Sequence, residues 1–503
     1  MLVYLIGAGP GDPGLLTLKG KAVLETADVV VYDYLANQSF LNFCRKDAEI
    51  IYVGKKGGDH TLPQDQINQL LVTKAKEGKV IARLKGGDPY VFGRGAEEAQ
   101  ELLAAGVNFE VVPGVTSGVA GLAYAGIPVT HRSYASSVSF ITGHEDPTKT
   151  TTALHWDALA KSASTLVFFM GMKNLPDIAS NLMAAGMSGS TPAALVHWGA
   201  TCRHRSCVGT LETLPRLAKE QKFTSPSLIV VGEVCKLHDE LNFFEKRPLL
   251  GKGIVVTRAR EQASDLASLL EAQGACVHQF PTIAVTPLTD FTVLDAALDE
   301  LGSYDWLVFT SINGVEHFWN RLLATGRDAR ALAGCKVAAI GPATAQGLKD
   351  RGIVADFLPE RFVAEYVAEG MLASGAAGKK ILVPRAKEAR ELLPDELRKA
   401  GCHVDVVPVY ETVRADSDAA ALLEVLQAGG VQCVTFASSS TVDNFFALVP
   451  ADEFRRLAPD AKLACIGPVT ANTLKKYGFG VDIQPEDYTI PALVQAVVDY
   501  CAH

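Results

Sequence analysis

One sequence pattern occurs twice in the second half of the chain. Residues 251–277, GKGIVVTRAREQASDLASLLEAQGACV, match residues 378–404, GKKILVPRAKEARELLPDELRKAGCHV, at an offset of 127 positions. Two more pairs follow in the same order: WLVFTSINGVEHF with CVTFASSSTVDNF, and KVAAIGPATAQGLKDRG with KLACIGPVTANTLKKYG. Three matched segments predict a duplicated unit across residues 251–503. The unit is far longer than the roughly 20–50 residues of a solenoid repeat.

Short apolar runs alternate with helix-length amphipathic stretches along the whole chain. Runs such as LVYLIGAG, DVVVYD, TLVFFMG, WLVFTS and CVTFAS are rich in β-branched and aromatic residues, which favour strands. Strands that alternate with helices predict α/β domains with largely parallel sheets. The charged stretch EKRPLLGK, residues 245–252, interrupts this alternation. We therefore expect two domains, residues 1–247 and 248–503, with the boundary at Pro248.

Composition excludes several classes of protein. No apolar run approaches the ~20 residues that span a bilayer, and the first residues, MLVYLIGAG, are typical of a first strand and not of a signal peptide. The ten cysteines form no CxxC pair, so we expect free thiols in a reducing compartment, the cytoplasm. A net charge of −9 argues against a nucleic-acid partner. We expect no membrane partner either.

A glycine-rich loop follows the first predicted strand. Residues 7–14 read GAGPGDPG, which contains a GxGxxG pattern, and Asp33 lies 24 residues beyond Gly9. A dinucleotide-binding loop is one interpretation. Pro10 and Pro13 weaken it, because they remove backbone N–H donors from the loop. A purely structural glycine turn is the other interpretation from this pattern alone.

Longer motifs in residues 1–245 resemble the tetrapyrrole methylase family. They are, in the family's order, VYLIGAGPGDPGLLTLKG, RLKGGDPYVFGRGAEE, VVPGVTSGVAGLAYAGIPVTHR, TLVFFMGM, TPAALVHWGAT and SPSLIVVGEV. Tyr32-Asp33 and Val53-Gly54-Lys55 look like the branch that methylates uroporphyrinogen III. The resemblance implies two α/β lobes with S-adenosylmethionine between them, and a homodimer formed through this half. It also implies two methylations to precorrin-2, a precursor of sirohaem and cobalamin.

The same resemblance implies a set of site residues. Asp33 and Lys55 match the proton acceptor and donor of the family. The positions implied around the cofactor are Pro10, Gly86, Gly87, Asp88, Val91, Thr116, Ser117, Met170 and Gly199. The sequence departs from the family's usual residues at three places: Tyr34 replaces Arg, Ser117 replaces Ala, and Trp198-Gly199-Ala200 replaces Asn-Gly-Thr.

Basic residues of the first half are candidates for the substrate, because uroporphyrinogen III carries eight carboxylates. Lys55, Lys56 and His60 cluster in the sequence, as do Arg83, Lys85 and Arg94, and His131 with Arg132. Of these we expect Lys56, Arg94 and Arg132 to bind substrate. The segment CRHRSC, residues 202–207, has two cysteines and a histidine, but its spacing is not that of a zinc finger, so we expect no metal.

Motifs of the second half resemble uroporphyrinogen-III synthase. They are GIVVTRA, FTSINGV, AIGPATA, PVYET, TFASSST and CIGPVTA, within residues 248–503. The resemblance implies two flavodoxin-like lobes, one built from residues 251–280 with 413–503 and the other from residues 286–406. The strands FPTIAVTP and DVVPVYET would join them. The implied reaction closes hydroxymethylbilane with loss of water and needs no cofactor.

Hydroxyl groups after predicted strands are the candidate residues of this second site. Tyr410, Thr344 and Thr470 are candidates for catalysis, and Thr310, Ser311, Ser438 and Ser439 for substrate binding. Serine and threonine at these places are also ordinary helix N-caps. The alternative function is a methyltransferase fused to a non-catalytic, two-lobed tetrapyrrole-binding module.

Overall fold

The computed structural model describes residues 2–54, 62–143, 154–258, 260–359, 364–389, 391–415, 417 and 419–501. Residues cluster into two compact units. Unit 1 comprises residues 1–253, 269–277 and 498–503, and unit 2 comprises residues 254–268 and 278–497.

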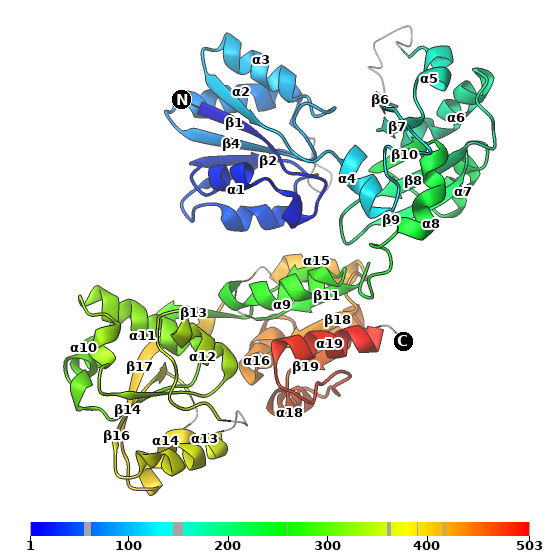
Figure 1. The fold of residues 1–503 in the computed structure, drawn as a ribbon. Coiled ribbons are helices and arrows are strands. Elements are labelled where there is room, and N and C mark those ends of the chain that lie inside the picture. The colour runs from blue at the N-terminus through cyan, green and yellow to red at the C-terminus, as the bar shows by residue number, and fades with distance from the viewer. Residues whose placement is uncertain are drawn as a thin grey trace. The chain divides into compact units, whose positions relative to one another are not determined.

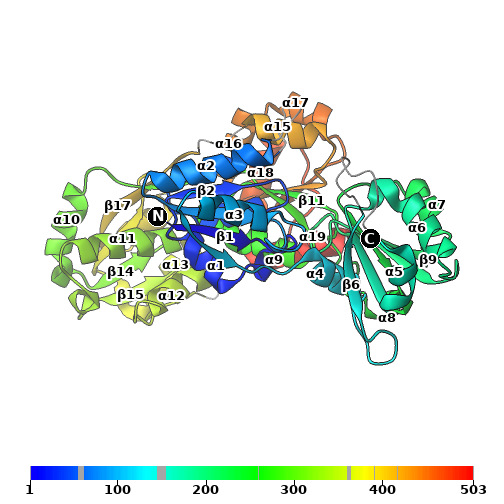
Figure 2. The same ribbon diagram turned by 90° about the horizontal axis from the view of Figure 1, so that it is seen from above.

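Five parallel strands form the first sheet of unit 1, in the order β3-β2-β4-β1-β5. They are β1 (Leu2–Gly7), β2 (Val29–Tyr32), β3 (Glu49–Tyr52), β4 (Val80–Lys85) and β5 (Asn108–Val112). Helices α2 (Gln64–Lys76) and α3 (Gly95–Ala104) cover one face (Figures 1 and 2). Helices α1 (Leu18–Leu24) and η2 (Gln38–Phe43) cover the other face, and η1 (Pro13–Leu15) follows β1. Leu5 and Ile6 are buried on opposite faces, as strand alternation requires.

A mixed sheet forms the second lobe of unit 1, in the order β6-β7-β10-β8-β9. Its strands are β6 (Val138–Thr142), β7 (Thr165–Phe169), β8 (Pro192–His197), β9 (Arg205–Thr210) and β10 (Ser227–Val231). Only the β6–β7 pair is parallel. Helices α5 (Trp156–Ser162), α6 (Leu175–Ala184) and α7 (Leu214–Glu220) pack on one face, and α4 (Ser117–Tyr124) and η4 (Glu233–Leu237) pack on the other. The short elements η3 (Met172–Asn174) and α8 (His238–Leu241) complete this lobe.

The C-terminal half contains a four-stranded sheet in the order β12-β11-β18-β19. Its strands are β11 (Gly253–Val256), β12 (Cys276–Gln279), β18 (Cys433–Phe436) and β19 (Lys462–Cys465). The helices of this part are α9 (Arg260–Ala272), α15 (Ala419–Gln427), α16 (Ser439–Leu448), α17 (Ala451–Leu457), α18 (Pro468–Lys476) and α19 (Ile490–Cys501). The first strand of this half therefore pairs with strands near its end.

The intervening residues form a five-stranded sheet in the order β13-β17-β16-β14-β15. Its strands are β13 (Ile283–Pro287), β14 (Trp306–Phe309), β15 (Lys336–Ala339), β16 (Lys380–Ala386) and β17 (His403–Arg414). Helices α10 (Thr292–Asp299), α11 (Ile312–Ala324) and α12 (Pro342–Lys349) pack on one face (Figure 2), and α13 (Ala364–Met371) and α14 (Leu392–Lys399) on the other. Short helical segments are η5 (Leu301–Ser303), η6 (Ala329–Leu332) and the π-helical η7 (Leu372–Ala376). The predicted ladder is confirmed, because β13 and β17 pair antiparallel.

The duplication extends to individual hydrogen bonds. The carboxylate of Asp356 accepts from the amide of Val337, and that of Asp482 accepts from the amide of Leu463. The second pair is offset from the first by 126 residues, since 482 − 356 and 463 − 337 both equal 126. The predicted α/β class and the duplicated unit are confirmed, whereas the domain boundary at Pro248 stays a prediction.

The expectation of free thiols is wrong for two cysteines. Cys202, in the loop after β8, forms a disulfide with Cys276, the first residue of β12. Both belong to unit 1. The amide of Gly251, which precedes β11, also donates to the carbonyl of Cys202 at 3.1 Å. The prediction failed because the two cysteines are 74 residues apart and have no spacing signature.

Among the helices in the described part of the chain, none has both the length and the hydropathy that a membrane crossing requires.

Candidate functional site

Glycine loops from three strands meet at the carboxyl edge of the first sheet. Gly9 and Gly87 exchange backbone hydrogen bonds of 3.1 and 2.7 Å. A Cβ atom on Gly7 would lie 2.4 Å from the Cα of Gly114, and one on Gly86 would lie 2.5 Å from the Cβ of Leu35. Only glycine fits at such distances, so these loops pack closely against one another and against Leu35.

The predicted cofactor positions lie on these loops and on the second lobe. Thr116 is the N-cap of α4 and Ser117 is its first residue. Gly87 and Thr116 adjoin, because a Cβ on Gly87 would lie 3.9 Å from the Cα of Thr116. Gly199 packs against Gly121 of α4. Pro10 follows Gly9 on the first loop, and Val91 packs against the core of the second lobe.

Met170 lies across a cavity from the loop after β4. The cavity has a volume of about 380 Å³ and is lined by Pro89, Tyr90, Phe92, Arg94, Gly95, Ala96, Glu97, Thr142 and Met170. Met170 has a positive φ of 56° and is half exposed, so its flexible thioether is available to a ligand.

Asp88 has a structural role that the sequence did not reveal. One carboxylate oxygen accepts from the amide of Tyr90 at 2.8 Å, and the other accepts from the amide of Gly114 at 3.0 Å. Asp88 therefore braces two loops, and these two bonds use two of its roughly four lone-pair sites.

Asp33 lies beside a buried group of charges. It follows β2, and its Oδ2 accepts from Nη2 of Arg83 at 3.2 Å, while its Oδ1 accepts from the amide of Leu35 at 3.1 Å. Arg83 and Lys85 of β4 are both 3 % exposed and face Glu98 of α3, which is fully buried. Burial, and the nearby Arg83, lower the pKa of the Lys85 ammonium.

This arrangement changes the interpretation of the basic cluster. Arg83 and Lys85 were grouped with Arg94 as candidates for the substrate, and the structure encloses them and pairs them with Glu98. Arg94 is the N-cap residue of α3 and forms two bonds with Glu97, at 3.0 and 2.7 Å. Arg132 is exposed in the turn after α4. Lys55, Lys56 and His60 lie outside the described residues.

Two of the positions that depart from the family's pattern contact each other. Tyr34 and Trp198 meet edge to face with ring centroids 5.6 Å apart. The guanidinium of Arg203 lies 3.6 Å from the centroid of the Trp198 ring. The contact joins the two lobes of unit 1 beside Asp33 and Gly199.

Tyr410 of β17 lies near the start of α11. Its hydroxyl is 3.2 Å from the hydroxyl of Ser311, and its ring stacks on His317 with centroids 5.4 Å apart. Ser311 is the N-cap of α11 and accepts from the amide of Gly314, and Thr310 precedes it. The structure therefore brings together Tyr410 and Ser311 of the predicted set. His317 was missed, because one histidine in a helix carries no sequence signal of function.

The other hydroxyl candidates follow the strands of the duplicated units. Thr344 and Thr470 occupy the third position of α12 and α18 and are 5 % and 3 % exposed. Ser438 is the N-cap of α16, in a capping box with Thr441. The hydroxyl of Ser439 donates to the carbonyl of Val469 at 3.4 Å. Ser438 thus has the capping role that is the ordinary reason for serine there.

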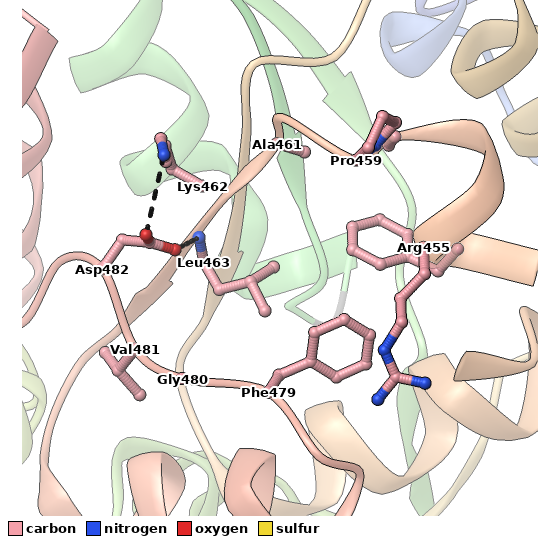
Figure 3. A pocket seen from close by; sticks show the side chains of 11 residues that line it. Arg455, Pro459, Ala461, Lys462, Leu463, Phe479, Gly480, Val481 and Asp482 are labelled. Carbon is pink, nitrogen blue, oxygen red and sulfur yellow. Dashed lines mark hydrogen bonds and ion pairs between the residues drawn. The ribbon is translucent and has the colours of Figure 1, made fainter. Parts of the chain in front are cut away.

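A second cavity, of about 450 Å³, lies at the N-terminal end of β19 (Figure 3). Arg455 lies over the ring of Phe479 at 4.4 Å, and Lys462, the first residue of β19, lies 3.8 Å from Asp482. Ser438, Ser439 and Thr470 follow the carboxyl ends of β18 and β19, so this cavity is separate from them.

Within the described ranges, His, Cys, Asp and Glu side chains do not gather in groups of three that could hold a metal ion. In the segment 202–207, the sulfur of Cys202 is bonded to Cys276 in the disulfide.

Comparison with known proteins gives a match for each half. Residues 2–215 match the family model "Tetrapyrrole (Corrin/Porphyrin) Methylases", and residues 264–495 match "Uroporphyrinogen-III synthase HemD". The chain is 38% identical over 498 residues to the "Porphyrin biosynthesis protein HemD" of Ruminiclostridium josui, covering 99% of this chain and 97% of the relative.

Two further proteins resemble the first half alone. The "Uroporphyrinogen-III C-methyltransferase" of Priestia megaterium is 53% identical over 232 residues, covering 46% of this chain and 97% of the relative. A crystal structure of a uroporphyrin-III C-methyl transferase from Thermus thermophilus, complexed with S-adenyl homocysteine, has 38% sequence identity and a TM-score of 0.40. That match covers 47% of this chain and 100% of the other.

The two family matches define a two-module enzyme, in which a C-methyltransferase is followed by a synthase. The chain belongs to the family of porphyrin-biosynthesis fusion proteins in which a tetrapyrrole methylase is joined to a uroporphyrinogen-III synthase.

Proposed function

We propose that this chain catalyses two consecutive reactions. The C-terminal half closes hydroxymethylbilane to uroporphyrinogen III with loss of water, and the N-terminal half methylates uroporphyrinogen III twice, with S-adenosylmethionine, to give precorrin-2. The observation that carries the proposal is that a single relative matches both modules over almost the whole chain.

The loops of unit 1 fit a methyl donor of this kind. Gly87 has a positive φ of 68°, and the nearest neighbouring atom lies 3.9 Å from its Cβ position, so a ligand can approach the backbone there. Thr116 and Ser117 offer hydroxyls, and Met170 offers an apolar contact. S-adenosylmethionine supplies an electrophilic methyl group when bound.

The chain's own residues position the pyrrole carbon and handle its proton. Asp33 lies at the end of β2 with a partly exposed carboxylate, which suits a proton acceptor. Lys55 is the proposed proton donor. Lys56, Arg94 and Arg132 are proposed to bind the substrate's carboxylates. Alignment of the methyl group with the carbon contributes the remaining rate enhancement.

Tyr410 is the proposed acid of the synthase, which works without a cofactor. Protonation of the departing hydroxyl by the Tyr410 phenol releases water and leaves a cationic azafulvene. Ring closure at the inverted last pyrrole follows, and the proton lost when the pyrrole becomes aromatic restores the phenol. Ser311, beside Tyr410, orients the phenol. Thr310, Ser438 and Ser439 are proposed to bind the folded polyanion, and Thr344 and Thr470 to assist catalysis.

The test is incubation of the full chain with hydroxymethylbilane and S-adenosylmethionine, with the product followed by absorbance and mass. Precorrin-2 is expected without added synthase. Recovery of uroporphyrinogen I, the spontaneous product, would instead favour the alternative of a non-catalytic tetrapyrrole-binding module in the C-terminal half.

We further propose a cytoplasmic homodimer, joined through the methyltransferase half and with no nucleic-acid or membrane partner. Light scattering of residues 1–247 and of the full chain tests the dimer.

We propose two domains with the boundary at Pro248, tethered across it by the Cys202–Cys276 disulfide. Residues 1–247 and 248–503, expressed separately, are expected to unfold cooperatively and to catalyse one step each. A C-terminal fragment that stays inactive until the other is added would contradict this boundary.

A further inference from the structure

Two cations and one carboxylate are enclosed between β4 and α3. Arg83 and Lys85 lie two residues apart on β4 and therefore point to the same face of the sheet. Each is 3 % exposed, and Glu98 is fully buried. Charged side chains are almost never this buried unless they are paired. The enclosure thus has a net positive charge that one further carboxylate must balance.

Asp33 supplies that second negative charge. Three edges of the Arg83 guanidinium are occupied: Nη1 donates to the carbonyl of Leu84 at 3.1 Å, Nε faces Glu98 at 3.4 Å, and Nη2 donates to Asp33 at 3.2 Å. A planar guanidinium held at three edges cannot turn. Arg83 can therefore present only one N–H group to Asp33.

Glu98 holds this arrangement through a single oxygen. Its Oε1 accepts from Nζ of Lys85 at 2.6 Å and from Nε2 of Gln64 at 3.0 Å, in addition to Nε of Arg83. Its Oε2 is buried and has no hydrogen-bond partner among the described residues. A native structure rarely leaves a buried carboxylate oxygen unpaired, and such groups often have a functional reason.

We propose that Glu98 is a positioning residue for methyl transfer, which fixes Arg83 so that Asp33 receives one hydrogen bond and stays available as a base. This inference rests on the proposed role of Asp33 in the methyltransferase. Without the charge of Glu98, Arg83 is free to turn and pair with both oxygens of Asp33. Asp33 then carries a closer positive charge and becomes a weaker base.

The main test replaces Glu98 by glutamine in the full chain, with Glu101→Gln as the matched control. Glu101 lies on the same helix but is exposed. For Glu98→Gln we expect kcat for methyl transfer to fall at least about 10-fold, as for impaired proton transfer. KM and the Kd for S-adenosylmethionine are expected to change less than about 3-fold, because the variant leaves binding contacts in place.

The pH profile separates positioning from general damage. In Glu98→Gln the acid limb of kcat is expected to move to lower pH by about half a unit or more, because excess positive charge favours the ionised carboxylate. Glu98→Asp is expected to recover part of kcat. In an Arg83→Gln background, Glu98→Gln is expected to cause little further loss of kcat, because Glu98 acts on Asp33 only through Arg83.

Several results would overturn the inference. They are a wild-type kcat in Glu98→Gln, a lowered kcat with an unchanged acid limb, or fully additive losses with Arg83→Gln. If Glu98→Gln does not unfold cooperatively, Glu98→Asp decides, because it keeps the charge but shortens the side chain and so loosens its hold on Arg83. A lowered kcat with the acid limb moved to lower pH supports the inference, and a wild-type kcat and pH profile overturn it. Absence of methylation by the unmodified chain would instead refute the proposed function.

Discussion

Tyr34 and Trp198 come from the two lobes of unit 1 and meet edge to face, 5.6 Å apart. Each replaces a residue more usual in the family, so the two departures form one structural feature. An edge-to-face pair contributes about 0.5–1.5 kcal/mol beyond burial.

We therefore predict coupling between Tyr34→Ala and Trp198→Ala. In a double-mutant cycle, the free-energy changes of unfolding are expected to differ from additivity by about 0.5–1.5 kcal/mol. Urea unfolding of the wild type, two single variants and the double variant measures this. Additive single effects would mean that the rings adjoin without cooperating.

Asp33→Asn is expected to lower methyl transfer by about 10²–10⁴-fold, because the variant loses its proton acceptor. Binding of S-adenosylmethionine should stay nearly unchanged, since the predicted cofactor contacts lie on other loops. Turnover at saturating cofactor and calorimetry measure the two quantities. Asp47→Asn, at an exposed ion pair with Arg45, is the control. Loss of cofactor affinity with normal turnover would place Asp33 in a binding site.

Tyr410→Phe is expected to slow ring closure by about 10²–10⁴-fold, because it removes the proposed acid. Tyr304→Phe is a matched control beside the same strand, since the Tyr304 hydroxyl donates to Asp405 of β17 at 2.8 Å, away from Ser311. Both variants lose one hydrogen bond, worth about 0.5–1.5 kcal/mol of stability. Chromatography of uroporphyrinogen isomers I and III follows the reaction. Equal activities of the two variants would refute the role of Tyr410.

Glu245 makes unit 1 sensitive to acid. Burial alone would raise the pKa of Glu245, but the facing His204 and hydrogen bonds from Ser206 and Asn242 outweigh burial and lower the pKa to about 2. A lowered carboxyl pKa stabilises the fold above the unfolded value of 4.5, and this stability is lost as the pH falls from 4.5 through about 2. The loss is roughly 2–3 kcal/mol.

Glu245→Gln should therefore unfold with a flatter pH dependence than the wild type across this window. Urea unfolding between pH 4.5 and 2 measures it. Glu240→Gln, at an exposed position of α8, is the control and should keep the wild-type slope. Parallel slopes for all three proteins would show that Glu245 does not titrate as described.

The Cys202–Cys276 disulfide is expected to stabilise unit 1 by roughly 2–4 kcal/mol, because it closes a long loop. Dithiothreitol should lower the melting temperature of the wild type by several degrees. A variant with serine at both positions should melt at the lower temperature with or without reductant. Cys44→Ser, at a free thiol, should behave like the wild type. A wild type insensitive to reductant would argue that the thiols are not joined.

Patterns repeated along the chain were predictable, and contacts between distant segments were not. The repeat offset of about 127 residues predicts that the segments holding Asp356–Val337 and Asp482–Leu463 are equivalent elements. It does not predict the hydrogen bond within each pair. Period and propensity are local properties, and they predict strands and helices well. The glycine loop after β1 was recognisable for the same reason.

Burial of Glu98 could not be inferred, because Glu97 and Glu98 are identical neighbours in the sequence. Their difference arises from helix geometry, which turns one toward β4 and the other toward solvent. Pairing of Cys202 with Cys276, and contact of Tyr34 with Trp198, depend on how loops far apart in the chain come together. Such contacts have no signature in local spacing.

The pairing of β11 with β18 has a consequence for how the chain folds as it is made. The hydroxyl of Thr435 donates to the carbonyl of Val255 across 180 residues. At a synthesis rate of about 5–20 residues per second, β11 leaves the ribosome roughly 9–36 s before β18 does. The intervening sheet, from β13 to β17, is complete in sequence before then. During translation that sheet can therefore fold first, while β11 has an unpaired edge that is exposed to incorrect pairing.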